Sequence, residues 1–116
     1  MSRHQAGTDA ETQAIEYLQA QGLTFVQRNF QVGKKEIDVI MRAQERWVFV
    51  EVKYRRNESF ARVLEQITPQ QCQRIRTAAR LFLLQQNITE HLTPMRFDVI
   101  AIVGEPASIQ WLQDAF

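Results

Sequence analysis

The sequence predicts a single α/β domain of 116 residues, in which helices flank a mixed central sheet in the order αβββαβ. Apolar β-branched residues alternate with polar ones in the first half of the chain, which is typical of half-buried strands. Two other segments show the 3.6-residue apolar spacing of amphipathic helices. Residues 97–103 are almost continuously apolar, as expected of a buried strand that runs parallel to its neighbour.

The first helix is expected to begin at Thr8, with Glu11 completing a capping box. Residues 1–7 would then form a flexible start to the domain, which spans 1–116. Gly22 is a plausible helix end, and residues 23–28 have the pattern of a first strand.

Residues 36–40 and 48–53 form the most informative pair of segments, a predicted β-hairpin that is rich in carboxylates. Alternation places Glu36, Asp38 and Ile40 on one face and Ile37, Val39 and Met41 on the other. In the second strand Phe49, Glu51, Lys53 and Arg55 share a face. If residues 43–46 form the turn, Asp38 lies directly across from Glu51, with β-carbons roughly 4.5–5.5 Å apart.

The second half of the chain is expected to begin with a loop over residues 56–67. Thr68 and Pro69 then open a second helix, with Thr68 as the cap. Its core stripe is Cys72, Ile75, Ala79, Phe82 and Leu83, and it ends near residues 86–87. Residues 97–103 follow as a strand parallel to the third, and residues 109–112 form a short last strand or a helix start.

Composition excludes several classes of protein. No run of eighteen apolar residues is present, which argues against a membrane span, and the first residues lack the apolar region of a signal peptide. The lone cysteine, Cys72, favours a reducing, cytoplasmic setting. Net charge is only +1, but twelve of the fourteen basic residues lie between Arg28 and Arg80, together with six acidic ones. That segment could face an anionic partner, or the cations could simply be solvated.

Two carboxylates facing each other across a hairpin destabilise it unless something offsets their repulsion. A Mg²⁺ ion would do so, because it is held by one or two carboxylates and keeps water or phosphate oxygens as its other ligands. The alternative is that Asp38 and Glu51 are exposed strand residues bridged by Lys53. Glu36 either binds a second metal or meets solvent. Asp98, inside an apolar strand, is expected to be a buried, hydrogen-bonded structural acid.

These residues carry a family resemblance. Asp38, twelve intervening residues and Glu51-Val52-Lys53 resemble the D…ExK core of the PD-(D/E)xK nuclease superfamily. The chain resembles more closely the uncharacterised YraN-type bacterial proteins of that superfamily, which are placed near the Holliday-junction resolvases. The matching segments are Ala10-Glu11-Thr12-Gln13-Ala14, Arg28-Asn29, Lys35-Glu36-Ile37-Asp38, Phe49 to Arg55, Phe97-Asp98-Val99 and Ala115-Phe116. Two departures stand out: Lys35 replaces a glycine, and Gln71 stands where the family usually has lysine.

The resemblance implies a restriction-endonuclease-like fold and a metal-dependent endonuclease that acts on DNA, with branched DNA as one candidate substrate. Mg²⁺ or Mn²⁺ would be held by Asp38, Glu51 and the Val52 carbonyl, with Lys53 acting on the attacking water or the developing charge. Glu11 would join the metal site, unless it serves only as a helix cap. The expected phosphate contacts are Arg55, Arg56, Arg74 and Arg76.

Two other functions remain open on the sequence alone. One is a nucleic-acid-binding module that keeps the site residues but cleaves little by itself. The other is a protein-interaction scaffold in which Trp47, Phe60 or Trp111 would be exposed anchors. An enzyme that cuts two strands of branched DNA would be expected to work as a homodimer.

Overall fold

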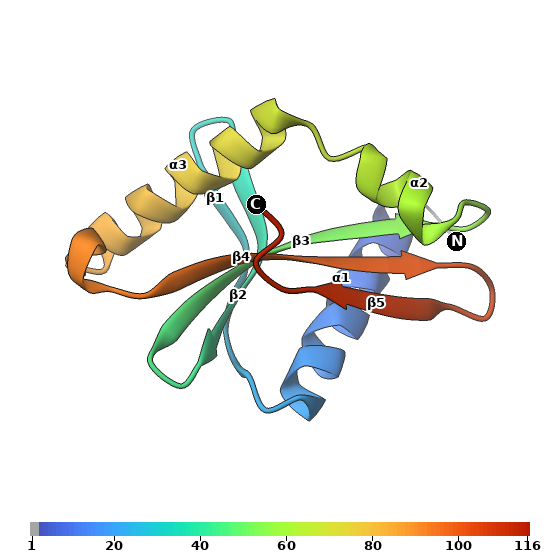
Figure 1. Ribbon diagram of the computed structural model, residues 1–116, viewed down its shortest axis with the longest axis horizontal. Helices are drawn as coiled ribbons and strands as arrows, with labels where there is room; N and C mark the ends of the chain where they lie inside the picture. Colours follow the sequence, from blue (N-terminus) through green and yellow to red (C-terminus); the bar gives the residue numbers. More distant parts are fainter. Residues whose placement is uncertain (1–2) are drawn as a thin grey trace.

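The structure is a computed structural model that describes residues 3–116, with side chains described for 9–89 and 91–116. A five-stranded sheet in the order β1-β2-β3-β4-β5 separates α1 from α2 and α3, which lie on the opposite face (Figure 1). The elements are α1 (Arg3–Ala20), β1 (Thr24–Val32), β2 (Lys35–Ala43), β3 (Arg46–Arg55), α2 (Phe60–Glu65), α3 (Pro69–Gln85), the 3-10 helix η1 (Glu90–Leu92), β4 (Met95–Val103) and β5 (Ser108–Leu112). The predicted mixed α/β architecture, a single compact domain, is confirmed.

Helix α1 begins earlier than the sequence predicts. It starts at Arg3, five residues before Thr8, so Thr8 is not its N-cap and Glu11 does not complete a capping box. No strong helix breaker separates Arg3 from Thr8, and a single glycine such as Gly7 costs only about 1 kcal/mol inside a helix. The expected flexible start of residues 1–7 falls partly outside the described residues, and from Arg3 onward the backbone is helical.

The end of α1 is where the sequence places it. Gly22 has φ 98°, a left-handed conformation that glycine adopts without a steric penalty. Gly22 N–H donates to the Gln19 carbonyl at 3.0 Å, and Leu23 N–H donates to the Leu18 carbonyl at 3.0 Å. These two bonds form a Schellman motif, which satisfies the last carbonyls of the helix and turns the chain into β1.

The sheet is mixed, as predicted. β1, β2 and β3 pair antiparallel, β3 and β4 pair parallel, and β4 pairs antiparallel with β5. β1 extends to Val32, four residues beyond the predicted strand end. The last segment, 108–112, is a strand and not a helix start. Ala43 pairs with Arg46, so the β2–β3 turn is shorter than the predicted 43–46 turn and the expected register is kept.

Two apolar cores lie on the two faces of the sheet. The α1-side core joins Ala14, Leu18, Val39, Met41, Val48, Val50, Ile100 and Ile102, and the α3-side core joins Phe30, Ile37, Ile40, Trp47, Phe49, Ile75, Phe82 and Leu83. The predicted faces of β3 are therefore confirmed. The prediction for β2 is wrong at Ile37, which packs in the α3-side core with Ile40 instead of with Val39 and Met41.

The cause is a local twist of the β1–β2 hairpin. Asn29 has φ 53°, a left-handed conformation that asparagine tolerates better than most residues. Arg28, just before it, reaches α1, where its guanidinium contacts Thr12 and Glu11. Phe30, just after it, packs in the α3-side core and pairs with Ile37. The two strands thus exchange faces beside Asp38, the residue of β2 that lies between Ile37 and Val39.

Helix α3 carries the predicted cap and core stripe. Thr68 Oγ1 accepts a hydrogen bond from Gln71 N–H at 3.1 Å, and Gln71 Oε1 accepts from Thr68 N–H at 3.1 Å, which completes a capping box. The core stripe is buried except at its first member, Cys72, which is only half-buried. The predicted loop 56–67 contains a short helix, α2, that the sequence analysis missed; Ser59 caps it through a bond from Arg62 N–H.

Asp98 is the structural acid that the sequence predicts. It is fully buried and accepts two hydrogen bonds from Arg96, one from Trp111 Nε1 and one from the Asp114 backbone N–H, all between 2.8 and 2.9 Å. It thereby ties β5 and the C-terminal segment to β4. Among the described residues, no helix is both long and apolar enough to cross a membrane.

Candidate active site

β2 and β3 part where their carboxylates lie. Their backbone pairing ends at Val39 and Val50, and the same register continued by one residue sets Asp38 opposite Glu51. In place of the next pairing bond, Asp38 Oδ2 accepts a hydrogen bond from Val52 N–H at 2.9 Å. The Asp38 side chain, on β2, thus takes the place of a backbone carbonyl as the acceptor for an N–H group of β3. This hydrogen bond fixes Asp38 beside Glu51.

The two acids form a strongly coupled pair. Burial, followed by the negative charge of Glu51, raises the pKa of Asp38 to about 8, against the lowering effect of the Val52 N–H. Burial likewise raises the pKa of Glu51, although Lys53 and a hydrogen bond with Asp38 work in the opposite direction. Since the two charges interact, Asp38 and Glu51 titrate as a pair, and loss of the first proton is a property of both carboxyl groups together.

Cations balance two of the three acids brought together here. Lys53 Nζ lies 3.4 Å from Glu51 Oε1, and both side chains are largely buried. Glu11, on α1, lies close enough to raise the pKa of Asp38 further, and its Oε1 contacts Arg28 Nη2 at 3.2 Å. Within residues 9–89 and 91–116, no ion pair involves Asp38.

A cleft opens above the two acids, with a volume of about 260 Å³. Its walls come from the β1–β2 turn on one side and from the first turns of α3 on the other, which lie beside each other in Figure 1. The lining residues are Lys34, Lys35, Glu36, Asp38, Glu51, Gln71, Arg74 and Ile75. Glu36 therefore lies at the cleft but is largely exposed to solvent.

Sequence reasoning missed Lys34 and Lys35 as members of this site. The signal was present, since two lysines directly follow Gly33 and directly precede Glu36-Ile37-Asp38. Lys35 does not have a positive φ, so its position does not demand the glycine that the resemblance predicts. Gln71, the other departure, is committed to the cap of α3 while it lines the cleft.

The four arginines expected at phosphates have different surroundings. Arg74 is exposed and lines the cleft, and Arg56 is exposed at the end of β3. Arg55 is held by the Tyr54 carbonyl at 2.6 Å and by Gln66 Oε1 at 3.1 Å. Arg76 lies over the rings of Phe97 and Phe116, at 5.9 and 5.8 Å.

Cys72, on α3, lies near the same acids. Its pKa is raised by burial and slightly by the charge of Glu51, whereas Arg76 lowers it. The thiol is a free, half-buried group at the edge of the α3-side core. It is thus less buried than the small core hydrophobe that the sequence predicts.

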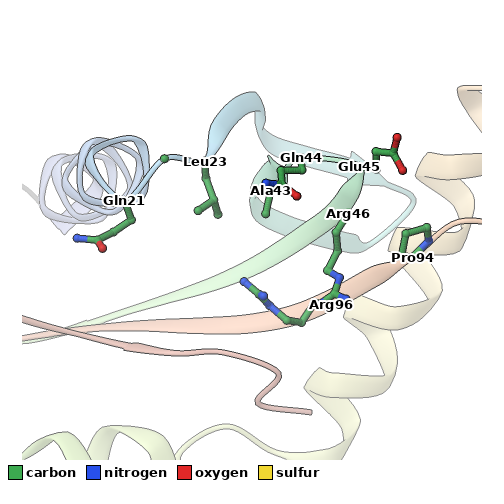
Figure 2. A pocket seen from close by; sticks show the side chains of 9 residues that line it. Gln21, Leu23, Ala43, Gln44, Glu45, Arg46, Pro94 and Arg96 are labelled. Carbon is green, nitrogen blue, oxygen red and sulfur yellow. The ribbon is translucent and has the colours of Figure 1, made fainter.

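A second hollow lies at the other end of the sheet, with a volume of about 440 Å³. Figure 2 shows that Arg46 and Arg96 extend into it from β3 and β4, below Leu23. Arg96 is already bound by Asp98, and the hollow contains none of the acids discussed above. Arg46 therefore offers an exposed cation that is separated from the cleft along β3.

No group of three or more Asp, Glu, His or Cys side chains in the described part of the chain has the arrangement of a complete metal site. The chemistry of the donors nevertheless suits a hard divalent cation, because Asp38 and Glu51 present two adjacent carboxyl groups and only Glu51 has a cation partner among the described residues. Mg²⁺ needs no more protein ligands than these, since water and phosphate oxygens supply the rest.

The fold is a mixed α/β domain, and its site is a cluster of two carboxyl groups and one lysine at the point where the pairing of β2 and β3 ends. This arrangement is consistent with a restriction-endonuclease-like fold. Residues 10–102 match the family described as Uncharacterised protein family UPF0102, and the chain belongs to that family. A UPF0102 protein of Idiomarina loihiensis is 52% identical over 110 residues, which cover 95% of each chain. A UPF0102 protein of Yersinia enterocolitica is 43% identical over 116 residues, covering all of this chain and 97% of the relative.

Proposed function

We propose that this protein is a metal-dependent endonuclease that hydrolyses phosphodiester bonds in DNA. One observation carries the proposal: Asp38 and Glu51 lie largely buried side by side where the pairing of β2 and β3 ends, with Lys53 beside Glu51. Buried, adjacent carboxylates with raised pKa values are costly to a fold and are concentrated at functional sites. The alternative, in which Asp38 and Glu51 are exposed strand residues bridged by Lys53, does not explain why both side chains are largely shielded from solvent.

The balance of charge favours a cation at the site. Lys53 offsets Glu51 and Arg28 offsets Glu11, while Asp38 keeps a proton up to about pH 8. A divalent cation would displace that proton and neutralise the pair. Asp38, Glu51 and the Val52 carbonyl are the groups that would hold Mg²⁺ or Mn²⁺. When bound, the metal would supply a more acidic water and a positive charge for the phosphate.

The other residues act through position and charge. Lys53 is held within 3.4 Å of Glu51, so its ammonium is fixed where negative charge would develop during hydrolysis. Glu11, oriented by Arg28, adds negative potential at Asp38 and so strengthens the attraction for a cation. Val52 N–H keeps one oxygen of Asp38 in place, which leaves the other oxygen for a ligand.

A nucleic-acid-binding module with little activity is the second candidate. Two observations favour it: the net charge is only +1, and Gln71 caps α3 where a cation would contact phosphate. The scaffold reading has less support. Trp47 is buried, Trp111 is half-buried with its Nε1 bound to Asp98, and Phe60 is half-buried, so none of the three is a fully exposed anchor.

The test of the proposed activity is a cleavage panel of linear, flapped and four-way DNA, and RNA, with Mg²⁺ or Mn²⁺. Lys53→Ala is expected to slow single-turnover cleavage by on the order of 10²–10³ and to leave binding nearly unchanged, because its charge acts mainly on the transition state. Arg74→Ala should instead weaken binding and retain the saturated rate.

Titration with Mn²⁺ provides the matched measurement on the metal. Wild type should bind weakly, and Asp38→Asn/Glu51→Gln should not bind. Equal heats from both proteins would remove the metal from the proposal. Absence of cleavage on every substrate, combined with retained DNA binding, would leave the binding module as the function.

A further inference from the structure

Three cations line the mouth of the cleft. Lys34 lies in the β1–β2 turn, Lys35 is the first residue of β2, and Arg74 comes from α3. In the described part of the chain, none of the three forms an ion pair. Lys34 and Arg74 are exposed and Lys35 is half-buried. Like charges that face one cleft from two walls repel each other unless an anion lies between them.

The acids of the cleft do not supply that anion. Glu51 is paired with Lys53 at 3.4 Å, on the floor, and Asp38 is bonded to Val52 N–H. Glu36 is the remaining acid of the lining; it is exposed, and in the described part of the chain no ion pair joins it to Lys34, Lys35 or Arg74. The largely buried Asp38 and Glu51 therefore form the floor of the cleft, and its more exposed rim carries the three cations beside a single acid, Glu36.

We infer that Lys34, Lys35 and Arg74 form a phosphate subsite that holds the backbone phosphate next to the one presented to Asp38 and Glu51. The ligand is a polynucleotide strand, since a chain of phosphodiesters places a second anion beside the one presented to Asp38 and Glu51. This inference rests on the proposed function only in assigning the reacting phosphate to Asp38 and Glu51. The subsite itself requires only that the protein binds nucleic acid. It adds two lysines to the contacts expected from sequence.

The subsite has a direct consequence for substrate choice. A strand that offers one phosphodiester without a charged neighbour would reach the floor but lose the rim contacts. Each cation that contacts a single strand contributes about 0.7 to the slope of log affinity against log salt concentration. Three cations together should account for about 2 units of that slope.

The experiment measures anisotropy of a fluorescent single-stranded oligonucleotide at several salt concentrations, in EDTA so that no metal or cleavage is needed. Lys34→Ala/Lys35→Ala/Arg74→Ala should bind at least tenfold more weakly than wild type at low salt and lose about 2 units of slope. Arg46→Ala, an exposed cation at the separate hollow of Figure 2, is the matched control and should lose no more than one contact. Lys35→Arg in an otherwise wild-type protein should retain the full slope.

A second arm uses an oligonucleotide in which alternate phosphates are replaced by neutral methylphosphonates. Wild type should lose affinity for it, and the triple variant should lose much less, because the contacts are already gone. An unchanged salt slope in the triple variant, or an equal loss in Arg46→Ala, would overturn the subsite. Neither outcome depends on cleavage, so the subsite stands or falls separately from the nuclease activity.

Discussion

Asp38 is a candidate site residue whose burial lowers the stability of the folded protein once its carboxyl group ionises. Its ordinary pKa is 3.8, and burial beside Glu51 raises it to about 8 in the folded protein. The unfolded chain releases this proton near pH 4, whereas the folded protein keeps it to about pH 8. The folded state thus binds the extra proton between these values, and the free energy of unfolding falls as pH rises through that window.

Asp38→Asn should therefore stabilise the protein at high pH. The amide cannot ionise, yet its oxygen can still accept from Val52 N–H. We expect the variant to be more stable than wild type by on the order of 2–4 kcal/mol at pH 8.5, and by about 1 kcal/mol or less at pH 4.5. Urea unfolding in chelated buffer at both pH values measures this. Asp9→Asn, at an exposed position of α1, is the control, and a pH-independent difference for Asp38→Asn would contradict the burial argument.

Asp98 is a buried acid with the opposite role, since four hydrogen bonds hold its carboxylate. Asp98→Ala would leave the guanidinium of Arg96, whose side chain is only 13% exposed, without its Asp98 partner. The expected loss is about 3–5 kcal/mol in the free energy of unfolding. Thermal or urea unfolding tests it, with Asp114→Asn as the control, because the variant keeps the backbone N–H that Asp98 accepts from and asparagine tolerates the φ of 54° at this position. A loss below about 1 kcal/mol would show that Arg96 finds another partner.

At the scale of elements, α3 couples the stability of the fold to the charge of the cleft. Its first turn is fixed by the reciprocal bonds of Thr68 and Gln71, and Gln71 and Arg74 from the same turns line the cleft. A residue at 71 can therefore either cap the helix or present a cation, and in this chain it caps.

Gln71→Lys should remove the side-chain cap of α3 and add a cation to the cleft. Loss of the bond to Thr68 N–H should cost about 0.5–1 kcal/mol of stability, since Thr68 Oγ1 still caps the Gln71 N–H. The added cation should raise the salt slope of single-strand binding by about 0.7. Urea unfolding and anisotropy measure the two effects on one protein. Thr68→Ala is the control: it should lose about 1 kcal/mol and leave the salt slope unchanged.

At the scale of the whole molecule, one sheet joins the two apolar cores, because β2 and β3 contribute buried residues to both. The cores should therefore unfold together. The two tryptophans report on them separately: Trp47 lies in the α3-side core, and Trp111 packs against the α1-side core.

We expect coincident unfolding transitions from both reporters. In Trp47→Phe the remaining fluorescence follows Trp111, and in Trp111→Phe it follows Trp47. Within each variant the fluorescence midpoint in urea should match the midpoint from far-UV circular dichroism, even though the substitutions shift the midpoint itself. A fluorescence transition that precedes the dichroism transition in one variant would show that its core melts alone.

Local patterns in the sequence determined much of this protein. Alternation gave the faces of β3, Thr68 and Pro69 gave the start of α3, Gly22 gave the end of α1, and one polar residue in an apolar run marked Asp98. These features depend on neighbours within a few residues, so the sequence can be read directly for them. The cross-strand register of Asp38 and Glu51 followed as well, because a short turn leaves little freedom in an antiparallel hairpin.

The tertiary structure alone decided the rest. The twist at Asn29 moved Ile37 to the other core, and no periodicity reveals a positive φ at a non-glycine residue. Lys34 and Lys35 joined the cleft because the β1–β2 turn packs beside α3, some forty residues away in the chain. The pairing of Glu11 with Arg28 likewise depends on α1 packing against the sheet. Such contacts arise from how the faces bury one another, which is a property of the whole fold and not of any segment.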